Sequence, residues 1–204
     1  MKDIRESKEK IIEAGIRLFA EKGFDGTSVD EISKLAGVNK AMIYYYFSSK
    51  EGLLLSIFKD SVEKFYSTIK DIDISRFDNF KDVLGYLVRK AIDYIDSNSL
   101  VVKIFLREDT RSEFWEVSVI DTISSIFDKI KLILMKKFSY LDIDLTIVEQ
   151  MLFVNLIVGY LNFKDRLLRS EVDDEVKELI KERYISKVSR MIYLLITDKE
   201  GEDG

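Results

Sequence analysis

Residues 27–47 constrain the fold of this chain more than any other stretch, because they predict two short helices joined by a tight turn. Ser28 and Glu31 have the spacing of a capping box, which supplies acceptors to the free amides at a helix start. Gly37 can adopt the left-handed conformation that ends a helix, and Asn39 can cap a second helix directly after it. The pattern is typical of a helix-turn-helix, whose second helix enters a DNA major groove.

The apolar positions of this stretch assign one face of each helix to the protein core. At helical spacing, the residues predicted to face inward are Ile32, Leu35, Ala36, Ile43 and Phe47. The remaining face of the second helix carries Lys40, Met42, Tyr44, Tyr45 and Tyr46. Three consecutive tyrosines cannot all be buried on one short helix, so we expect some of the hydroxyls to point outward.

The composition excludes several classes of chemistry. The 204 residues include no cysteine, which excludes disulfides, thiolate catalysis and cysteine-ligated zinc, and no histidine, which is the usual general base. We therefore expect no enzyme, no cofactor and no metal. There is no proline and there are only 9 glycines, so we predict an all-α fold. No run of eighteen apolar residues occurs, which favours a soluble, cytoplasmic protein.

The net charge of −5 is unevenly distributed along the chain. Residues 1–50 carry nine basic and eight acidic side chains, a balance of +1, whereas the rest of the chain has a balance of −6. This distribution is compatible with a local DNA-facing surface on an acidic body, but it argues against a broad basic footprint.

The whole chain is predicted to form about nine helices. Besides the two short ones, apolar periodicity indicates helices at about 8–22, 49–70, 77–96, 100–108, 112–138, 145–168 and 175–196. The helix at 8–22 and the two short helices would form a compact head, and residues 71–76 are the expected linker. Ser48 and Glu51 suggest a second capping box. Lys50 would then lie in the first turn of helix 4, where the helix dipole disfavours a cation unless a phosphate binds there; the alternative is a solvated lysine.

The segment from Gly37 to Leu53 resembles the signature of the TetR family of transcriptional regulators. The turn glycine, the Tyr-x-x-Phe run and a Lys-Glu pair opening helix 4 occur together in register, and the resemblance covers about residues 8–60. It implies a homodimer with a DNA-binding domain at 1–50, including the helix-turn-helix at about 28–47, and a ligand-binding and dimerisation domain at 51–204. Helix 4, from residue 49, would link the two.

The resemblance also implies which residues touch DNA. Lys40, Ala41 and Met42 would face base edges, while the tyrosines would contact phosphates and thymine methyl groups. Lys50 would contact a phosphate, and Thr27 or Ser28 the DNA backbone. The complete set is Thr27, Ser28, Lys40, Ala41, Met42, Tyr44, Tyr45, Tyr46 and Lys50. The sequence departs from the common family pattern at Met42 and Tyr46, and Asp30 would repel a phosphate that it faced.

The last two helices are expected to form the dimer interface. Residues 145–168 are apolar almost all round, so that helix needs cover on every side, either from its own chain or from a second copy. Pairing it and residues 175–196 with their symmetry mates would give the four-helix interface that TetR-like regulators use. Burial within the monomer is the alternative.

A ligand pocket is expected within the C-terminal domain. The candidate lining residues are Phe65, Arg89, Phe105, Arg107, Trp115, Phe127, Phe153, Asn155, Tyr160 and Asn162. The aromatic members could equally be plain core, and the two asparagines could bind across the dimer seam. Arg89 and Arg107 are candidates for an anionic head group. Glu108 and Asp109, beside Arg107 and Arg111, are most simply a self-neutralising turn, with a Mg²⁺ or acid–base carboxylate pair as the alternative.

Taken together, the sequence predicts a ligand-responsive repressor. It would bind a near-palindromic DNA operator as a homodimer and be released by a small apolar or amphipathic effector. One alternative is an architectural or division-type DNA-bound factor without an effector. The other is a helical adaptor or enzyme with a vestigial head.

Overall fold

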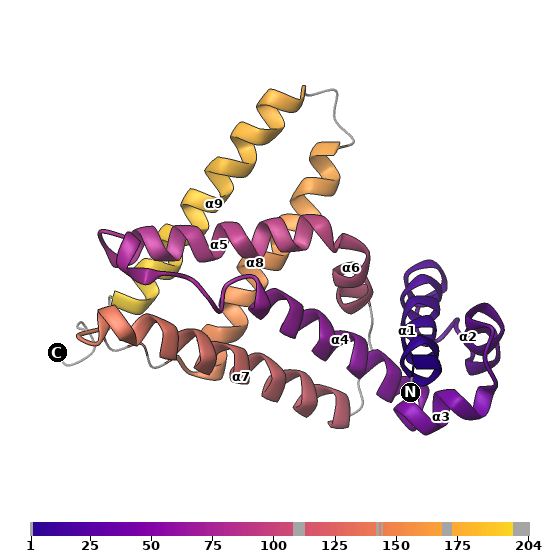
Figure 1. The fold of residues 1–204 in the computed structure, drawn as a ribbon. Coiled ribbons are helices and arrows are strands. Elements are labelled where there is room, and N and C mark those ends of the chain that lie inside the picture. The colour runs from indigo at the N-terminus through magenta and orange to yellow at the C-terminus, as the bar shows by residue number, and fades with distance from the viewer. Residues whose placement is uncertain (1, 108–112, 142, 144, 169–172, 198–204) are drawn as a thin grey trace. The chain divides into compact units, whose positions relative to one another are not determined.

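The computed structural model describes residues 2–107, 113–141, 143, 145–168 and 173–197, and over these residues the chain is helical without a strand. The helices, seen in Figure 1, are α1 (Lys2–Lys22), α2 (Val29–Ala36), α3 (Lys40–Phe47), α4 (Lys50–Ser67), α5 (Phe80–Ser97), α6 (Ser99–Arg107), α7 (Glu113–Phe138), α8 (Ile147–Leu168) and α9 (Asp174–Thr197), with a short 3-10 turn at Ile74–Arg76. The predicted all-α fold is confirmed.

Helix boundaries differ from the prediction mainly where no apolar stripe marks them. α1 begins at Lys2 rather than near residue 8, because a polar stretch can be helical without the apolar stripe from which the start was predicted. α4 ends at Ser67 rather than near residue 70. There the Thr68 amide and hydroxyl both donate to the carbonyl of Phe65, and such three-residue bonds tighten and close a last helical turn.

The chain divides into two compact units, which we call the head unit (1–64 and 98–122) and the body unit (65–97 and 123–204). In the head unit, α1 packs against α2, α3 and α6. Ile104 of α6 is fully buried in the same apolar core as Ile11, Ile32 and Ile43. The head core therefore includes a helix that lies fifty residues beyond the helix-turn-helix. The predicted functional boundaries, 1–50 and 51–204, stay a prediction.

The face of α2 that packs against the core is narrower than the sequence suggested. Ile32 and Ala36, one turn apart, are buried, but Leu35 is 46% exposed. The prediction that Leu35 faces the core is therefore wrong. An eight-residue helix crossing α1 buries a single row of side chains, and Leu35 lies beside that row.

In the body unit, α5, α8 and α9 pack against one another. Val83, Val88 and Ile92 of α5 are buried with Leu161 of α8 and Ile192 of α9. The C-terminal end of α8 and the N-terminal end of α9 project beyond α5 (Figure 1). Within the described residues, no helix is long and apolar enough to cross a membrane.

Candidate DNA-binding interface

The start of α2 is fixed by the predicted capping box. The Glu31 amide donates to the Ser28 hydroxyl oxygen over 3.2 Å, and the Ser28 amide donates to the Glu31 carboxylate over 2.9 Å. Lys22, at the end of α1, donates to the same carboxylate over 2.6 Å. The Lys22 amine and then the Ser28 groups lower the pKa of Glu31 to about 2. Glu31 therefore closes the first turn of α2 and also ties it to α1.

The turn between α2 and α3 also has the predicted geometry. Gly37 has φ 66° and ψ 33°, a left-handed conformation that a side chain would strain. The next amide, of Val38, donates to the carbonyl of Ser33 over 3.0 Å. The Asn39 side chain then accepts from the Ala41 amide over 2.8 Å and caps α3. The helix-turn-helix is therefore fixed at both sides of its turn.

The outer face of α3 exposes two of the three tyrosines. Tyr45 is 81% exposed and Tyr44 is 47% exposed, so the expectation of outward hydroxyls is met by these two. Tyr46 and Met42 are partly buried and pack against the head core. Ala41 is exposed at the start of the helix. Tyr44, Tyr45 and Ala41 are thus the members of the predicted contact set that α3 presents most openly.

Lys40 opens α3 but is engaged by an acidic side chain. Its amine lies 2.8 Å from the carboxylate of Asp30 on α2. The hydrogen bond to Asp30 raises the pKa of Lys40. The positive charge of Lys40 is therefore offset at the surface by the negative charge of Asp30. From the sequence, Asp30 was predicted only to repel a phosphate that it faced. Ten residues separate the pair, so no helical spacing could have indicated the contact.

Thr27 and Lys50 face inward rather than outward. The Thr27 side chain is only 2% exposed, and its hydroxyl donates to the carbonyl of Gly23 over 2.7 Å. The Lys50 amine donates to the carbonyls of Phe24 and Thr27 over 2.7 and 2.9 Å. It also lies 4.0 Å from the centre of the Phe24 ring. These two residues hold the loop before α2; any contact of theirs with DNA stays a prediction.

The predicted second capping box at Ser48 is wrong. Ser48 ends α3 with a positive φ of 65° and a ψ of −36°, and its amide donates to the carbonyl of Tyr44. The N-cap of α4 is the next residue, Ser49, whose hydroxyl accepts from the Gly52 amide over 3.0 Å. A residue whose positive φ terminates one helix lacks the extended backbone of an N-cap and cannot cap the following helix.

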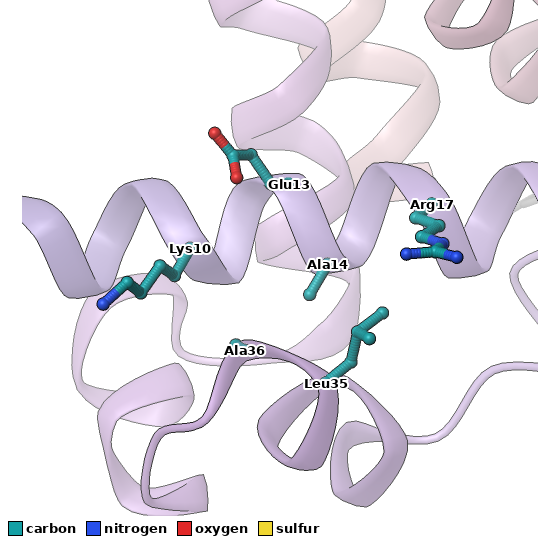
Figure 2. Close-up of a pocket in the computed structure, with 6 residues that line it drawn as sticks. All are labelled: Lys10, Glu13, Ala14, Arg17, Leu35 and Ala36. Atoms are coloured by element: carbon teal, nitrogen blue, oxygen red, sulfur yellow. The ribbon is translucent and has the colours of Figure 1, made fainter.

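A shallow hollow of about 360 Å³ lies on the head unit between α1 and α2. Its lining residues are Lys10, Glu13, Ala14, Arg17, Leu35 and Ala36. Figure 2 shows Ala14 and Leu35 turned toward each other, whereas the Glu13 carboxylate points away. The hollow thus lies beside the partly exposed side chain of Leu35.

The predicted ligand-pocket residues are divided between the two units. Phe105 lies in the head unit, where its ring meets Phe58 at 5.1 Å. In the body unit, Phe65 meets Tyr94 at 5.7 Å and Phe127 meets Phe153 at 6.2 Å. Asn155 and Asn162 are both exposed on α8. The side chains of Arg107 and Trp115, and residues Glu108 and Asp109, lie outside the described part of the structure. A pocket formed by this set stays a prediction.

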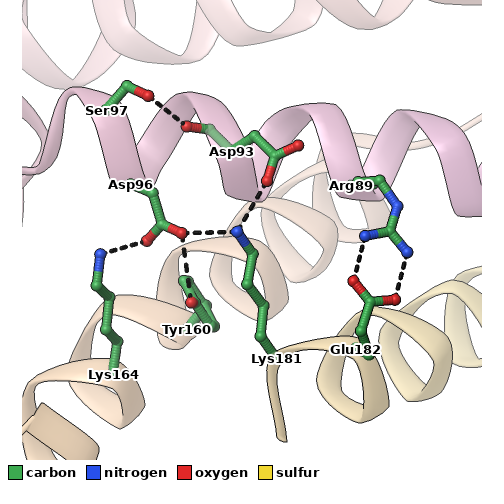
Figure 3. Close-up of polar contacts among 8 residues, drawn as sticks. All are labelled: Arg89, Asp93, Asp96, Ser97, Tyr160, Lys164, Lys181 and Glu182. Atoms are coloured by element: carbon green, nitrogen blue, oxygen red, sulfur yellow. Dashed lines mark hydrogen bonds and ion pairs between the residues drawn. The ribbon is translucent and has the colours of Figure 1, made fainter. Parts of the chain in front are cut away.

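The body unit contains an ionic network that no spacing in the sequence indicates. Figure 3 shows the amines of Lys164 on α8 and Lys181 on α9 converging on the Asp96 carboxylate of α5, at 2.6 and 2.9 Å. Lys181 also lies 2.8 Å from Asp93. Burial opposes ionisation of Asp96, but the two lysines outweigh it and lower the pKa of the carboxyl group.

Two further members of the predicted pocket adjoin this network. Burial, followed by the charge of Asp96, raises the pKa of Tyr160 to about 12, and the Tyr160 hydroxyl lies 3.4 Å from that carboxylate. Arg89 forms a two-point ion pair with Glu182 of α9. Arg89 is therefore already paired, and a role for it in binding an anionic head group stays a prediction.

Residues 11–57 match a known protein family, described as bacterial regulatory proteins, tetR family. Residues 11–57 belong to the TetR family. Among curated relatives, the chain is 33% identical over 107 residues to the biofilm operon negative transcriptional regulator IcaR of Staphylococcus epidermidis. That match covers 52% of this chain and 55% of the relative. The chain thus matches about half the length of this relative.

The full fold is also that of the family. A TetR family regulator from a Shewanella species superposes with a TM-score of 0.71 at 21% identity, covering 93% of this chain and 97% of the other. The regulator FadR from Bacillus subtilis, solved in complex with stearoyl-CoA, gives a TM-score of 0.67 at 19% identity over 92% and 97% of the two chains. At these identities, the similarity establishes a TetR-type fold for the chain beyond its head.

Proposed function

We propose that this chain is a transcriptional repressor that binds a near-palindromic operator as a homodimer and is released by a small apolar or amphipathic effector. The observation that carries the proposal is α3, a short helix fixed by caps at both sides of the preceding turn, whose open face is aromatic. The similarity of the chain to IcaR, which is named as a negative regulator, favours repression over activation.

On the operator, α3 would lie in the major groove. Ala41 and the first turn of α3, with Lys40 and Met42, would face base edges. Tyr44 and Tyr45 have the exposure needed to reach phosphates and thymine methyl groups, and Tyr46 would contribute only its edge. Ser28 is exposed at the N-terminus of α2, where the positive end of the helix dipole would favour a nearby phosphate. Thr27 would act indirectly, by holding the loop.

The homodimer would use α8 and α9. Large apolar side chains remain exposed on both helices, including Leu152 and Phe163 on α8 and Leu179 and Leu194 on α9. A helix that is apolar beyond the face its own chain covers is suited to burial against a second copy. Two-fold symmetry would then place two recognition helices about 34 Å apart, one helical turn of DNA.

The effector would act from the body unit. The FadR structure contains stearoyl-CoA, an amphipathic ligand, and we propose a ligand of that general character here. Phe65, Phe127, Phe153 and Tyr160 remain the candidate lining residues of the body unit. Binding would tilt α4 and change the separation of the two heads. Such a ligand acts only through its different affinity for the two head spacings.

Operator selection from random duplex DNA tests the proposal. We expect the wild-type protein to select one near-palindromic sequence, and a Tyr45→Ala, Lys40→Ala double variant to bind it at least about tenfold more weakly. Tyr140→Ala with Lys59→Ala is the matched control, because both residues are exposed and neither lies on the helix-turn-helix. Equal affinity of the double variant and the control would overturn the assignment of α3 as the reading helix.

Mass spectrometry of ligands that copurify with the protein tests the effector. We expect an amphipathic compound whose addition releases the protein from the selected operator. Binding at many genomic loci that no copurified compound reverses would instead favour an architectural factor.

A further inference from the structure

Lys50 occupies an unusual place for a cation. It is the first residue of α4, at the helix end where unpaired amides make a positive charge unfavourable. In the described part of the chain, its partners are two carbonyl oxygens and the face of a phenylalanine ring, and no carboxylate. The partial negative charges of these groups compensate for the helix end. The Lys50 ammonium group is therefore stabilised at this helix end by contacts within the protein.

Both carbonyls belong to the loop that joins α1 to α2. This loop is closely folded: the Thr27 amide donates to the carbonyl of Phe24 over 3.1 Å, and the Thr27 hydroxyl donates to that of Gly23. Gly26 is required there, because a Cβ atom would lie 2.4 Å from the carbonyl oxygen of Lys22. The Phe24 ring is buried against Phe19, at 5.6 Å between ring centres. A rigid loop with two convergent carbonyls is a fixed receptor for one ammonium group.

We propose that Lys50 is a positioning residue that ties the first turn of α4 to the loop before the helix-turn-helix. Ser28, which caps α2, directly follows Thr27, whose carbonyl Lys50 holds. A displacement of α4 therefore reaches the N-terminus of α2 through one lysine and one peptide unit. The inference deepens the proposed function, on which it rests for its DNA readouts, by naming the contact that carries movement of α4 to the DNA-reading motif.

A phosphate contact and a positioning contact make different demands on the same side chain. An ammonium group has three donors, and the loop carbonyls use two of them, which leaves one for a phosphate. If Lys50 served only a phosphate, its removal would weaken binding to every DNA sequence alike and reduce the salt slope by about 1. If it positions the motif, its removal would loosen the free protein and reduce the preference for the operator over other DNA.

The test compares full-length Lys50→Met with the wild-type protein, because methionine keeps the length and removes the donors. We expect the unfolding transition of the head unit to fall by roughly 3–8 °C. Hydrogen exchange of the amides at 24–36 is expected to accelerate about tenfold. Affinity for the selected operator should fall about tenfold, while affinity for a scrambled duplex changes by less than about twofold. Lys50→Arg, which keeps donors and charge, should recover part of each loss.

Lys59→Met is the matched control, since Lys59 is exposed on the same helix, and it should leave all these readouts unchanged.

A direct measurement on the wild type does not depend on the folding of a variant. Scalar couplings across the hydrogen bonds from the Lys50 amine to the Phe24 and Thr27 carbonyls should be visible by NMR.

Unchanged melting and exchange in Lys50→Met, with a uniform loss of DNA affinity and a smaller salt slope, would overturn the proposal in favour of a phosphate contact alone. A destabilised head with a smaller slope would support the link and add a phosphate contact to it. If the wild type binds no DNA, the proposed function fails, but melting, exchange and the NMR couplings still decide whether Lys50 holds the loop.

Discussion

Three lysines of the head unit bind oxygen atoms of a neighbouring element. Lys22 contacts Glu31, Lys40 contacts Asp30, and Lys50 contacts the carbonyls of the loop before α2. A count of charges in the sequence treats all three as positive groups available to DNA. In the structure they hold α1, α2, α3 and α4 to one another. The number of cations free to meet phosphates is therefore smaller than the composition indicates, and we expect a shallow salt dependence of DNA binding.

Asp30→Asn tests whether the ion pair with Asp30 limits the contribution of Lys40 to DNA binding. Releasing the Lys40 amine and removing a carboxylate near the phosphates should strengthen binding to all duplexes about threefold or more. The slope of log affinity against log salt should become more negative by about 1. Fluorescence anisotropy over a range of salt concentrations measures both quantities. Asp78→Asn, in the body unit, makes the same change in net charge and should have neither effect; an unaltered slope in Asp30→Asn would contradict the prediction.

Glu31→Gln tests the junction of α1 and α2 through its pH dependence. The folded-state pKa of about 2 lies below the ordinary value of 4.5. The carboxylate therefore contributes stability fully above pH 4.5, progressively less below it, and none below about pH 2. Glutamine can still accept from the Ser28 amide but cannot pair with Lys22 as a charge. We expect a lower melting temperature than wild type at pH 7.

The pH profile of the melting temperature distinguishes this role from a general loss of packing. The difference between wild type and Glu31→Gln should shrink as the pH falls from 4.5 toward 2. Glu13→Gln, an exposed glutamate of α1, provides the comparison at each pH. A difference that stays constant across this range would show that the Glu31 charge is not responsible.

At the scale of helices, the ionic network around Asp96 joins three elements that are distant in sequence. Asp96 and Asp93 lie on α5, Lys164 on α8 and Lys181 on α9, and the Lys181 side chain is only 16% exposed. Arg89 and Glu182 add a second α5–α9 pair along the same helices. Two charged contacts along one pair of helices fix their register as well as their separation, which apolar packing alone leaves less specified.

Lys181→Met should destabilise the body unit by about 2–4 kcal/mol, because it leaves the largely buried Asp96 carboxylate with one cation fewer. Denaturant unfolding monitored at α9 measures the loss. Lys177→Met on the same helix removes an ion pair whose acidic partner, Asp174, is 98% exposed. That variant should change stability by less than about 0.5 kcal/mol. Equal losses in the two variants would contradict a special role for the network.

The local signals in the sequence were sufficient for the helix-turn-helix but not for its surroundings. Ser28, Gly37 and Asn39 act within three or four residues of themselves, so their capping roles could be predicted from spacing alone. The ion pair of Arg89 with Glu182 joins residues 93 apart in the chain, and no periodicity reports it. Leu35 was misplaced because the width of a buried face depends on the helix packed against it. Ser48 was misplaced because one residue could serve either of two adjoining helices.

At the scale of the whole molecule, the exposed apolar side chains of α8 and α9 bear on assembly. We expect the wild-type protein to sediment at twice its chain mass of 23.8 kDa. Leu152→Glu with Leu194→Glu places a carboxylate on each helix and should shift the mass to that of one chain. Leu132→Glu is the control, because Leu132 is 68% exposed on α7. A monomeric wild type, or a dimer that tolerates both glutamates, would contradict this interface.

The burial of Ile104 in the head core has a consequence for how the protein can be divided or recombined. A fragment that ends after α4 would lack α6. The apolar surface of α1 that α6 covers would then be open to water, so we expect the fragment to aggregate or to melt at a lower temperature. Exchanging DNA specificity between relatives by grafting residues 1–64 would break the same contact. A functional graft has to carry α6 with it, or rebuild the face of α1 that Ile104 covers.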